Sequence, residues 1–563
     1  MSKLFNLAAT ATAILLMASV AGCGTTTPAS NKTGGNTGNS KSTTSQSPIE
    51  GGSLNIDMGQ NIQTLDPAVT DDLTSDELIT EMYDPLVTYD GSTNTLVGDM
   101  AEKWTVSPDG KTYTFTLRKG ITFWNGDPVT ANSYIAEFER VLTKKLASPA
   151  SARLYPIVEG STAFYKGQAK TISGVTAPDP YTLQIKLVKP ESFFLQLLAE
   201  PAFVAVDPKW ISSVGNANFA TSKPMGTGAF ELKSTDGTTE VLTKNQHYFL
   251  KDSHGNQLPY LDQVTFSYNK NTEVDAMKFQ QGSEPFLAFN TQGIPVSSYH
   301  MFMANPKLKQ DVTTATTGDM WYIGLNVTQA PFTNVKVRQA VEYAINKPFL
   351  VKLLNNMDTV ANQPVPPDAF GYMKQLPASI DYTYNPEKAK QLLASSGLSL
   401  PIHAKFYSSN DATTQKVVEE IQNELKAVGI DLTVQPLSWS AFLSGNGQGT
   451  QPSFLIDWNQ SFPDAFDFLN TLFNTTEQPI NNSEMYSNKQ VDQWLNEAQT
   501  ETDPQKRFDL YKKVTVQAME DASVVPVYYG KYTFAIQPWV HGYYINSNLE
   551  EDPLTHIWVD PGH

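Results

Sequence analysis

Cys23 is the only cysteine in this chain of 563 residues. The body that follows it can therefore form no internal disulfide, and its stability must come from the burial of apolar side chains. Hydrophobic residues make up 40% of the sequence and aromatic residues 11%, which is enough to build large cores. Because a single core stops growing beyond roughly 250–300 residues, we expect about two to four domains after residue 50.

The residues before Cys23 have the layout of a secretory signal peptide. Lys3 gives a positive charge, an apolar stretch follows, and Val20-Ala21-Gly22 places small residues directly before the cysteine. The stretch is too short, and wrongly flanked, for a membrane-spanning helix. The tetrad ending at Cys23 resembles the lipobox of bacterial lipoproteins, which implies cleavage after Gly22 and lipidation of Cys23. We expect a signal peptide over residues 1–22.

Residues 23–50 are expected to be the lipidated cysteine and a flexible tether. They are mostly Ser, Thr, Gly and Asn, and they bury too little to offset the entropy of ordering. Two acyl chains suffice for stable anchoring where one does not. We therefore expect the body to sit at the outer face of the cytoplasmic membrane, anchored and not spanning. Its net charge of −17 argues against a nucleic-acid partner.

The body shows the periodicities of both strands and helices. Strict alternation of apolar and polar residues predicts half-buried strands, and Asn-Pro, Asp-Pro and Gly signals predict where helices begin and end. Strands alternating with helices indicate α/β lobes. We expect strands at 53–56, 113–117, 183–187 and 430–434, and helices at 76–86, after Asn385-Pro386, over 417–428 before Gly429, and after Asp503-Pro504.

Motifs for enzyme chemistry are absent from the sequence. It contains no H-E-x-x-H, G-x-S-x-G or phosphate-loop motif, and its seven histidines are scattered. We expect neither an enzyme nor a cofactor or metal; a surface hydrolase is the alternative from another class. Large aromatic residues beside turns, such as Trp439 and Trp458, indicate recognition instead. Core packing is the competing interpretation of each such aromatic.

Several blocks in the body resemble one known family. They are the stretch from Met100 to Gly120, Phe123 to Ala131, Gly226 to Phe230, Val525 to Tyr529, and Pro538 to Tyr543. Together they resemble the oligopeptide-binding members of the peptide/nickel solute-binding lipoproteins that serve ABC importers, bacterial extracellular solute-binding family 5. The resemblance runs in order from about residue 54 to 560.

This resemblance implies a fold. It is an α/β, two-lobed periplasmic-binding-protein fold of type II, with an extra subdomain in the first lobe and a two-strand hinge. The expected limits are 51–92, 205–312 and 530–563 for lobe I, 93–204 for the inserted subdomain, and 313–529 for lobe II. The ligand would lie between the lobes and be enclosed when they close.

The resemblance also implies a function and a binding site. A monomeric receptor would capture oligopeptides and deliver them to an ABC permease and its ATPase subunits; an oligosaccharide receptor on the same fold, or a signalling receptor without a permease, is the alternative. The loop after residue 456 resembles the family's G-W-x-A-D-Y loop. The expected ligand-binding residues are Asp71, Leu73, Tyr322, Trp439, Asp457, Trp458, Asn459, Ser461 and Asp464.

Ser461 departs from the family pattern. It stands where the family has the aspartate that pairs with a peptide's ammonium group, and a hydroxyl does not replace that charge. Either Asp457 or Asp464 takes over the ammonium from a shifted position, or the ligand has no free amine. In a sugar receptor, Trp439 and Trp458 would instead be stacking platforms.

Overall fold

The computed structural model describes residues 47–70, 72–93, 95–155, 157–219, 224–289, 293–546 and 552–563. Pro48–His563 forms one unit, separate from Met1–Ser47, and the fold below is that of the larger unit. Cys23 and Asp71, both expected to be functional, lie outside the described residues. Among the described helices, none combines the length and apolarity that crossing a membrane would require.

Sheet A carries the first strand of the body. Its order is β1-β10-β9-β8, with β1 parallel to β10 and the other neighbours antiparallel. Helix α1 packs beside β8. The strands are β1 (Ser53–Met58), β8 (Phe230–Thr235), β9 (Thr239–Lys244) and β10 (Gln263–Tyr268), and the helices of this part are α1 (Leu73–Met82), α6 (Pro208–Val214), α7 (Thr272–Gln281) and α8 (Val296–Ala304).

Sheet B is an antiparallel sheet inserted in sequence between β1 and β8. Its order is β4-β5-β7-β6, and α2 packs against β6 and β7. A short hairpin, β2 (Val87–Tyr89) with β3 (Leu96–Gly98), precedes it. The elements are β4 (Ala101–Val106), β5 (Thr112–Leu117), α2 (Ala131–Val141), α3 (Ser151–Leu154), α4 (Ser161–Tyr165), β6 (Val175–Asp179), β7 (Thr182–Lys186) and α5 (Phe194–Leu197).

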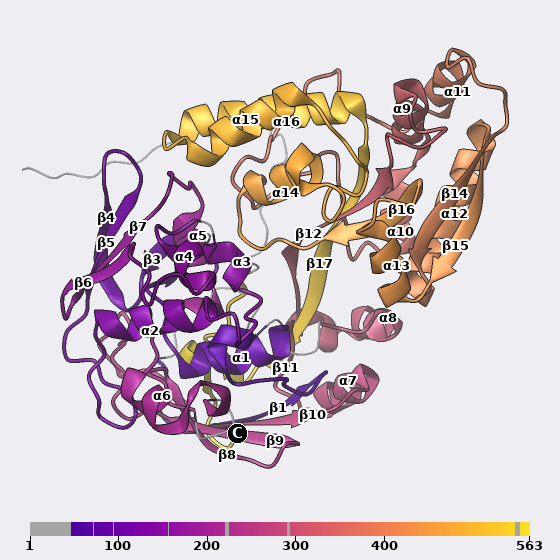
Figure 1. Cartoon of the computed structure of the whole chain (residues 1–563). Coiled ribbons are helices and arrows are strands. Elements are labelled where there is room, and N and C mark those ends of the chain that lie inside the picture. Colours follow the sequence, from indigo (N-terminus) through magenta and orange to yellow (C-terminus); the bar gives the residue numbers. More distant parts are fainter. Residues whose placement is uncertain are drawn as a thin grey trace, which may run out of the picture. The chain divides into compact units, whose positions relative to one another are not determined.

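Sheet C contains the two longest strands, β12 (Val312–Leu325) and β17 (Val524–Ile536), which pair antiparallel. Figure 1 shows them running from beside β11 toward β16. They thus link two halves of the unit, one containing sheets A and B and the other containing β14, β15 and β16 of sheet C. The order is β11-β17-β12-β16-β14-β15, with β13 also on β17. The other strands are β11 (Phe286–Leu287), β13 (Thr359–Val360), β14 (Ile402–Ser409), β15 (Ile430–Leu437) and β16 (Ser453–Trp458).

The helices that follow β12 surround sheet C. Helix α12 packs on β14 and β15, α10 and α16 contact β17, and α15 lies along α16. Near the C-terminus, β18 (Val540–His541) pairs with β19 (Trp558–Val559). The helices are α9 (Val335–Ala344), α10 (Lys347–Leu353), α11 (Pro386–Ala394), α12 (Ala412–Val428), α13 (Trp439–Asn446), α14 (Ala465–Phe473), α15 (Lys489–Thr500) and α16 (Pro504–Asp521).

The predicted strands coincide with β1, β5, β7 and β15, and three of the predicted helices are confirmed. Asn385 and Asp503 are the N-caps of α11 and α16, and Gly429 ends α12 in the left-handed conformation. The helix predicted at 76–86 was misplaced. It spans Leu73–Met82, because the Asp72 side chain accepts a hydrogen bond from Ser75 N and starts the helix earlier.

The apolar cores do not follow the sheets one to one. Sheet A and α1 share one core, and sheet C shares another with α9 and α12. A third core begins in sheet B and α2 and continues into α14 and α16, on the side of sheet C. The domain limits expected from the sequence stay a prediction.

Candidate functional site

A β-bulge interrupts β12 in the middle of its pairing with β17. Thr316 pairs with Lys531 and Met320 with Tyr529, so three residues, Thr317 to Asp319, face the single residue Gly530. A Cβ at Gly530 would lie 2.7 Å from Thr317 Oγ1 and 3.0 Å from Asp319 Oδ2. Bulges change the direction of a side chain relative to its strand and are common next to binding sites. This bulge places the Asp319 carboxyl beside the neighbouring strand's loop.

The loop after β16 lies over the bulge. Asp457 and Trp458 end β16 and pair with Trp321 and Met320 of β12. A Cβ at Gly318, whose φ is +71°, would lie 2.8 Å from Gln460 Cβ. Glycine is therefore required at 318 both by the close approach and by the left-handed backbone.

Asn459 joins the two acids. With its amide nitrogen turned toward them, Asn459 donates to Asp319 Oδ1 at 2.8 Å and to Asp457 Oδ2 at 3.2 Å. Thr317 Oγ1 also donates to Asp319 Oδ2, at 2.7 Å. Two carboxyl groups from different strands are thus held around one amide group.

Burial raises the pKa of each acid at this position. Burial raises the pKa of Asp319 to about 7, and the nearby Asp457, Asp358 and Asp368 add to the increase. Burial also raises the pKa of Asp457, and it raises that of Asp358 to about 6. Among the described residues no ion pair reaches Asp319 or Asp457. A cation placed between them would restore their charge.

Ser461 lies on an exposed part of the same loop. Its backbone N–H donates to Asp467 Oδ2 at 2.8 Å, and the Trp458 indole Nε1 donates to the same oxygen at 3.3 Å. Burial raises the pKa of Asp467 to about 7. Asp467 is 6% exposed, so these two hydrogen bonds attach the loop to a buried carboxyl group.

Asp464 has partners of its own in the interior. It is fully buried and caps α14, accepting from Phe466 N at 2.9 Å and from the Tyr511 hydroxyl at 2.7 Å. Arg507 Nη2 lies 3.2 Å from Asp464 Oδ2. The acid is therefore already matched to a cation, and the arrangement favours Asp457 over Asp464 as the shifted ammonium-binding residue.

The other expected residues lie at different depths. Tyr322 is 2% exposed on β12, opposite Ile456 of β16. Trp439, the first residue of α13, is 48% exposed and its ring lies 5.8 Å from that of Phe442. Leu73 is 38% exposed at the start of α1. Within the described part of the chain, no hydrogen bond or ring contact links Trp439 or Leu73 to the loop.

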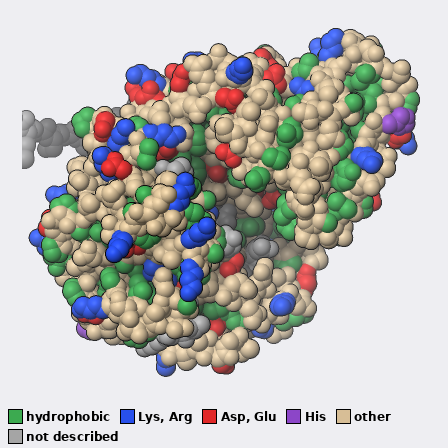
Figure 2. Space-filling view, viewed as in Figure 1, with side chains coloured by type: hydrophobic (Ala, Val, Ile, Leu, Met, Phe, Trp, Pro, Cys, Tyr) green, Lys and Arg blue, Asp and Glu red, His purple; other side chains and the backbone are tan. Residues whose placement is uncertain are grey.

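The surface is hollowed where β12 and β17 pass between the two halves of the unit. Figure 2 shows this hollow, with acidic side chains inside it. The group formed by Asp319, Asp457, Trp458, Asn459 and Ser461 belongs to these strands and their loop, and we take it as the candidate site. No trio of His, Cys, Asp or Glu side chains is arranged to hold a metal ion in the parts of the chain that the structure describes.

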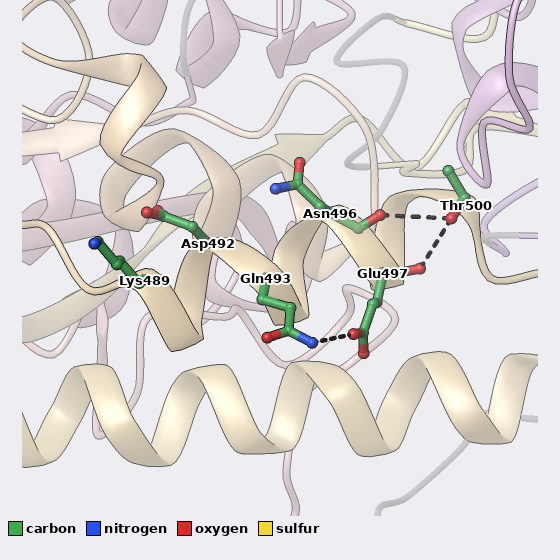
Figure 3. A pocket seen from close by; sticks show the side chains of 6 residues that line it. All are labelled: Lys489, Asp492, Gln493, Asn496, Glu497 and Thr500. Atoms are coloured by element: carbon green, nitrogen blue, oxygen red, sulfur yellow. Dashed lines mark hydrogen bonds between the residues drawn. The ribbon is translucent and has the colours of Figure 1, made fainter.

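A second depression lies on α15 (Figure 3). It measures about 490 Å³ and is lined by Lys489, Asp492, Gln493, Asn496, Glu497 and Thr500. Gln493 Nε2 donates to Glu497 Oε1 at 2.7 Å, and Thr500 Oγ1 donates to the Glu497 carbonyl at 3.3 Å. These bonds run along one helix, as they do on an ordinary solvent-facing surface, and we assign no site there.

A cavity of about 530 Å³ lies beside α1 and is lined by residues that include Asp84, Asp99 and Tyr248. The Asp84 carboxyl accepts hydrogen bonds from the hydroxyls of Thr227 and Tyr248, and burial raises its pKa to about 6. These bonds hold the start of β2 against the 227–248 region. We interpret them as structural.

Asp319 was missed by sequence reasoning. A signal was available, because Gly318 is an isolated glycine within a strand pattern, and such a glycine indicates a bulge. The partner across the bulge could not be inferred, since it depends on the pairing of β12 with β16. Asp467 was missed because its role depends on the fold of the loop above it.

Comparisons with known proteins agree with the fold. Residues 95–479 match the bacterial extracellular solute-binding proteins, family 5 (middle part). The glutathione-binding protein GsiB of Escherichia coli K12 is 31% identical over 500 residues, covering 87% of this chain and 91% of that protein. GsiB of Shigella dysenteriae is also 31% identical, over 504 residues with the same coverage.

Solved structures share the fold. A clavulanic acid biosynthesis oligopeptide binding protein 2 has a TM-score of 0.82 at 22% identity, covering 91% of this chain and 96% of that one. DppA from Helicobacter pylori, in complex with the peptide STSA, has a TM-score of 0.71 at 24% identity, covering 91% and 98%. The fold class is thus the two-lobed α/β fold of periplasmic binding proteins, as the resemblance implied. This chain belongs to the family 5 bacterial extracellular solute-binding proteins, the solute-binding components of ABC importers.

Proposed function

We propose that this chain captures oligopeptides with a free amino terminus and presents them to an ABC permease. The observation that carries the proposal is the pair Asp319 and Asp457, bridged by Asn459 at 2.8 and 3.2 Å. A peptide ammonium placed between them would donate charge-assisted hydrogen bonds to both acids. The proteins similar to this chain are described as binding glutathione or oligopeptides, which supports the same ligand class.

Enclosure completes the proposed mechanism. The site lies on β12, one of the two long strands that link the halves of the unit. Rotation about these strands would bring the two halves together over a peptide and exclude water from its charged end. The backbone of the peptide would be held like an added strand, with side chains in hydrated pockets. We propose a monomeric receptor that performs no chemistry on its ligand.

Native mass spectrometry of the unit Pro48–His563, purified without refolding, tests the ligand class. Receptors of this kind enclose their ligands, so we expect a retained molecule whose fragments give a ladder of amino-acid masses. Fragments that differ by the mass of one hexose would contradict the peptide proposal. They would instead favour an oligosaccharide receptor in which Trp439 and Trp458 are stacking platforms.

The affinity for free-amine peptides should depend on pH. In the empty site the pKa of Asp319, about 7, lies above its ordinary value of 3.8, so the acid is mostly neutral below pH 7. An ammonium binds the charged form, so affinity should fall as the pH drops below 7, by up to about tenfold per unit for one displaced proton. Calorimetric titration from pH 8 to 5.5 measures this, with the acetylated peptide as a control of constant affinity. Equal pH profiles for both peptides would contradict the role of Asp319.

We also propose that Cys23 carries the lipid that anchors the protein at the outer face of the membrane. Cys23→Ala should abolish lipid labelling, and the protein should be released or remain an uncleaved precursor. Radiolabelled palmitate incorporation and membrane fractionation measure both effects. Thr27→Ala, four residues further on, is the matched control and should label normally. Undiminished labelling of the Cys23 variant would refute the anchor.

A further inference from the structure

A short segment after sheet B, Lys189 to Phe193, reaches across to the helices beside sheet C; we name it the clasp. Ser192 N donates to the carbonyl oxygen of Gln499 at 3.0 Å, and Lys189 Nζ donates to Gln499 Oε1 at 2.6 Å. Gln499 lies near the end of α15. The clasp therefore connects the two halves of the unit at a place other than β12 and β17.

Arg507 of α16 joins the clasp to the binding loop. Its Nη1 donates to the Ser192 carbonyl at 3.1 Å, and its Nη2 lies 3.2 Å from Asp464 Oδ2. Asp464 in turn caps α14, directly after the loop of the candidate site. One guanidinium group thus holds the clasp and the end of the loop together. The Arg507 side chain is only 12% exposed, so both contacts are largely shielded from solvent.

Aromatic packing supports the same connection. The Phe193 ring stacks on Phe462 and Phe466, with centroid distances of 4.8 and 5.0 Å. Phe193 and Phe466 are each 6% exposed and belong to the core that runs from sheet B into α14 and α16, and the partly buried Phe462 packs against this core. Opening the clasp would expose these rings to water and leave Arg507 without its carbonyl partner, both of which are unfavourable.

Two bodies that stay connected at two places can rotate only about a line through both places. The strands β12 and β17 provide the first connection. We propose that the clasp is the second, a pivot that stays formed while the halves close. This inference rests on the proposed lobe closure. Because Phe462 is part of the binding loop, Phe193 is also a positioning residue for that loop, without touching the ligand.

A reversible crosslink tests the pivot. The 3.0 Å hydrogen bond from Ser192 N to the Gln499 carbonyl brings these two residues together, and a disulfide joins residues whose Cα atoms are about 4.4–6.8 Å apart. Ser192→Cys with Gln499→Cys in the unit Pro48–His563 gives one possible disulfide, because this unit contains no other cysteine. The radius of gyration is measured by solution scattering with and without an equimolar mixture of free-amine tri- and tetrapeptides. The single variant Ser192→Cys is the control.

If the clasp is a pivot, the oxidised and reduced proteins contract equally and bind the peptide mixture with affinities within about twofold of each other. Contraction in the reduced protein only, with affinity more than tenfold weaker after oxidation and recovered with dithiothreitol, would overturn the pivot. No contraction in either state would overturn lobe closure itself, and the pivot with it.

Hydrogen exchange of the unmodified protein gives a second measurement that needs no variant. The Ser192 amide donates to the Gln499 carbonyl at 3.0 Å, so we expect it to be protected from exchange. We expect its protection to stay the same or increase when the peptide mixture is added. A tenfold or greater loss of protection on binding would mean that closure breaks the clasp, and would overturn the proposal.

Discussion

Replacing both Asp319 and Asp457 by asparagine should weaken the binding of free-amine peptides by about 10- to 100-fold, while acetylated peptides bind as before. Hydrogen bonds to charged groups contribute about 1.5–3 kcal/mol, and the double variant removes the charge from both acceptors. The shape of the site is kept, because asparagine has the size of aspartate. The Asn459 amide can still donate to the side-chain carbonyl oxygens of the two new asparagines. Isothermal titration calorimetry with matched free and acetylated tetrapeptides measures the difference.

The stability of this double variant separates binding from folding. Burial holds the pKa of Asp319 and Asp457 above the ordinary range, so their charges cost stability in the empty protein. We expect the variant to be as stable as the parent or more stable at pH 8. Asp431→Asn is the matched control, since Asp431 lies on β15, is 43% exposed and should change neither property. Equal losses of affinity for both peptides would argue against an ammonium site.

Arg140→Met should lower the free energy of unfolding by about 3–5 kcal/mol, the range for breaking a buried charge pair by removing one partner. Arg140 on α2 is 4% exposed and contacts Asp66 at 2.6 Å and Glu137 at 2.8 Å. Its guanidinium also lies 4.4 Å from the centre of the Phe219 ring. Methionine fills much of the space but leaves two buried carboxyl groups without a cation.

Chemical denaturation measures this loss, and its pH dependence identifies the cause. Burial raises the pKa of Glu137 to about 7 while Arg140 opposes the increase. Without Arg140 the Glu137 carboxyl can be relieved by protonation, so the deficit should be smaller at pH 5 than at pH 8. Lys390→Met removes an exposed pair with Glu387 and should change stability by less than about 0.5 kcal/mol. A deficit that does not vary with pH would point to lost packing instead.

Local signals predicted local structure well. Asn385 and Asp503 start helices because their side chains accept bonds from the first free N–H groups, and such caps depend only on neighbouring residues. Gly429 ends α12 for an equally local reason. The helix at 73–82 was placed three residues late, because Asp72 was not recognised as its cap. The two-lobed fold came from the resemblance to the family, since no local pattern contains the pairing of distant strands.

The site was only partly predictable. Asp457, Trp458, Asn459 and Ser461 were found together because they are adjacent in sequence. Asp319 is separated from them by more than a hundred residues and reaches them only through the register of β12 with β16. Asp464 was a reasonable candidate from its position, but the sequence gives no indication that Arg507 lies against it.

The bulge at Thr317 to Asp319 also divides β12 into two halves that pair with β17 in different registers. Val312 to Thr316 pair with Lys531 to Ala535, whereas Met320 to Gly324 pair with both β16 and the first half of β17. Because side chains alternate along a strand, losing a single residue at the bulge would turn the buried Met320 and Tyr322 to the opposite face. Chimeric receptors that exchange ligand-binding halves between relatives should therefore be joined on either side of this tripeptide, never within it.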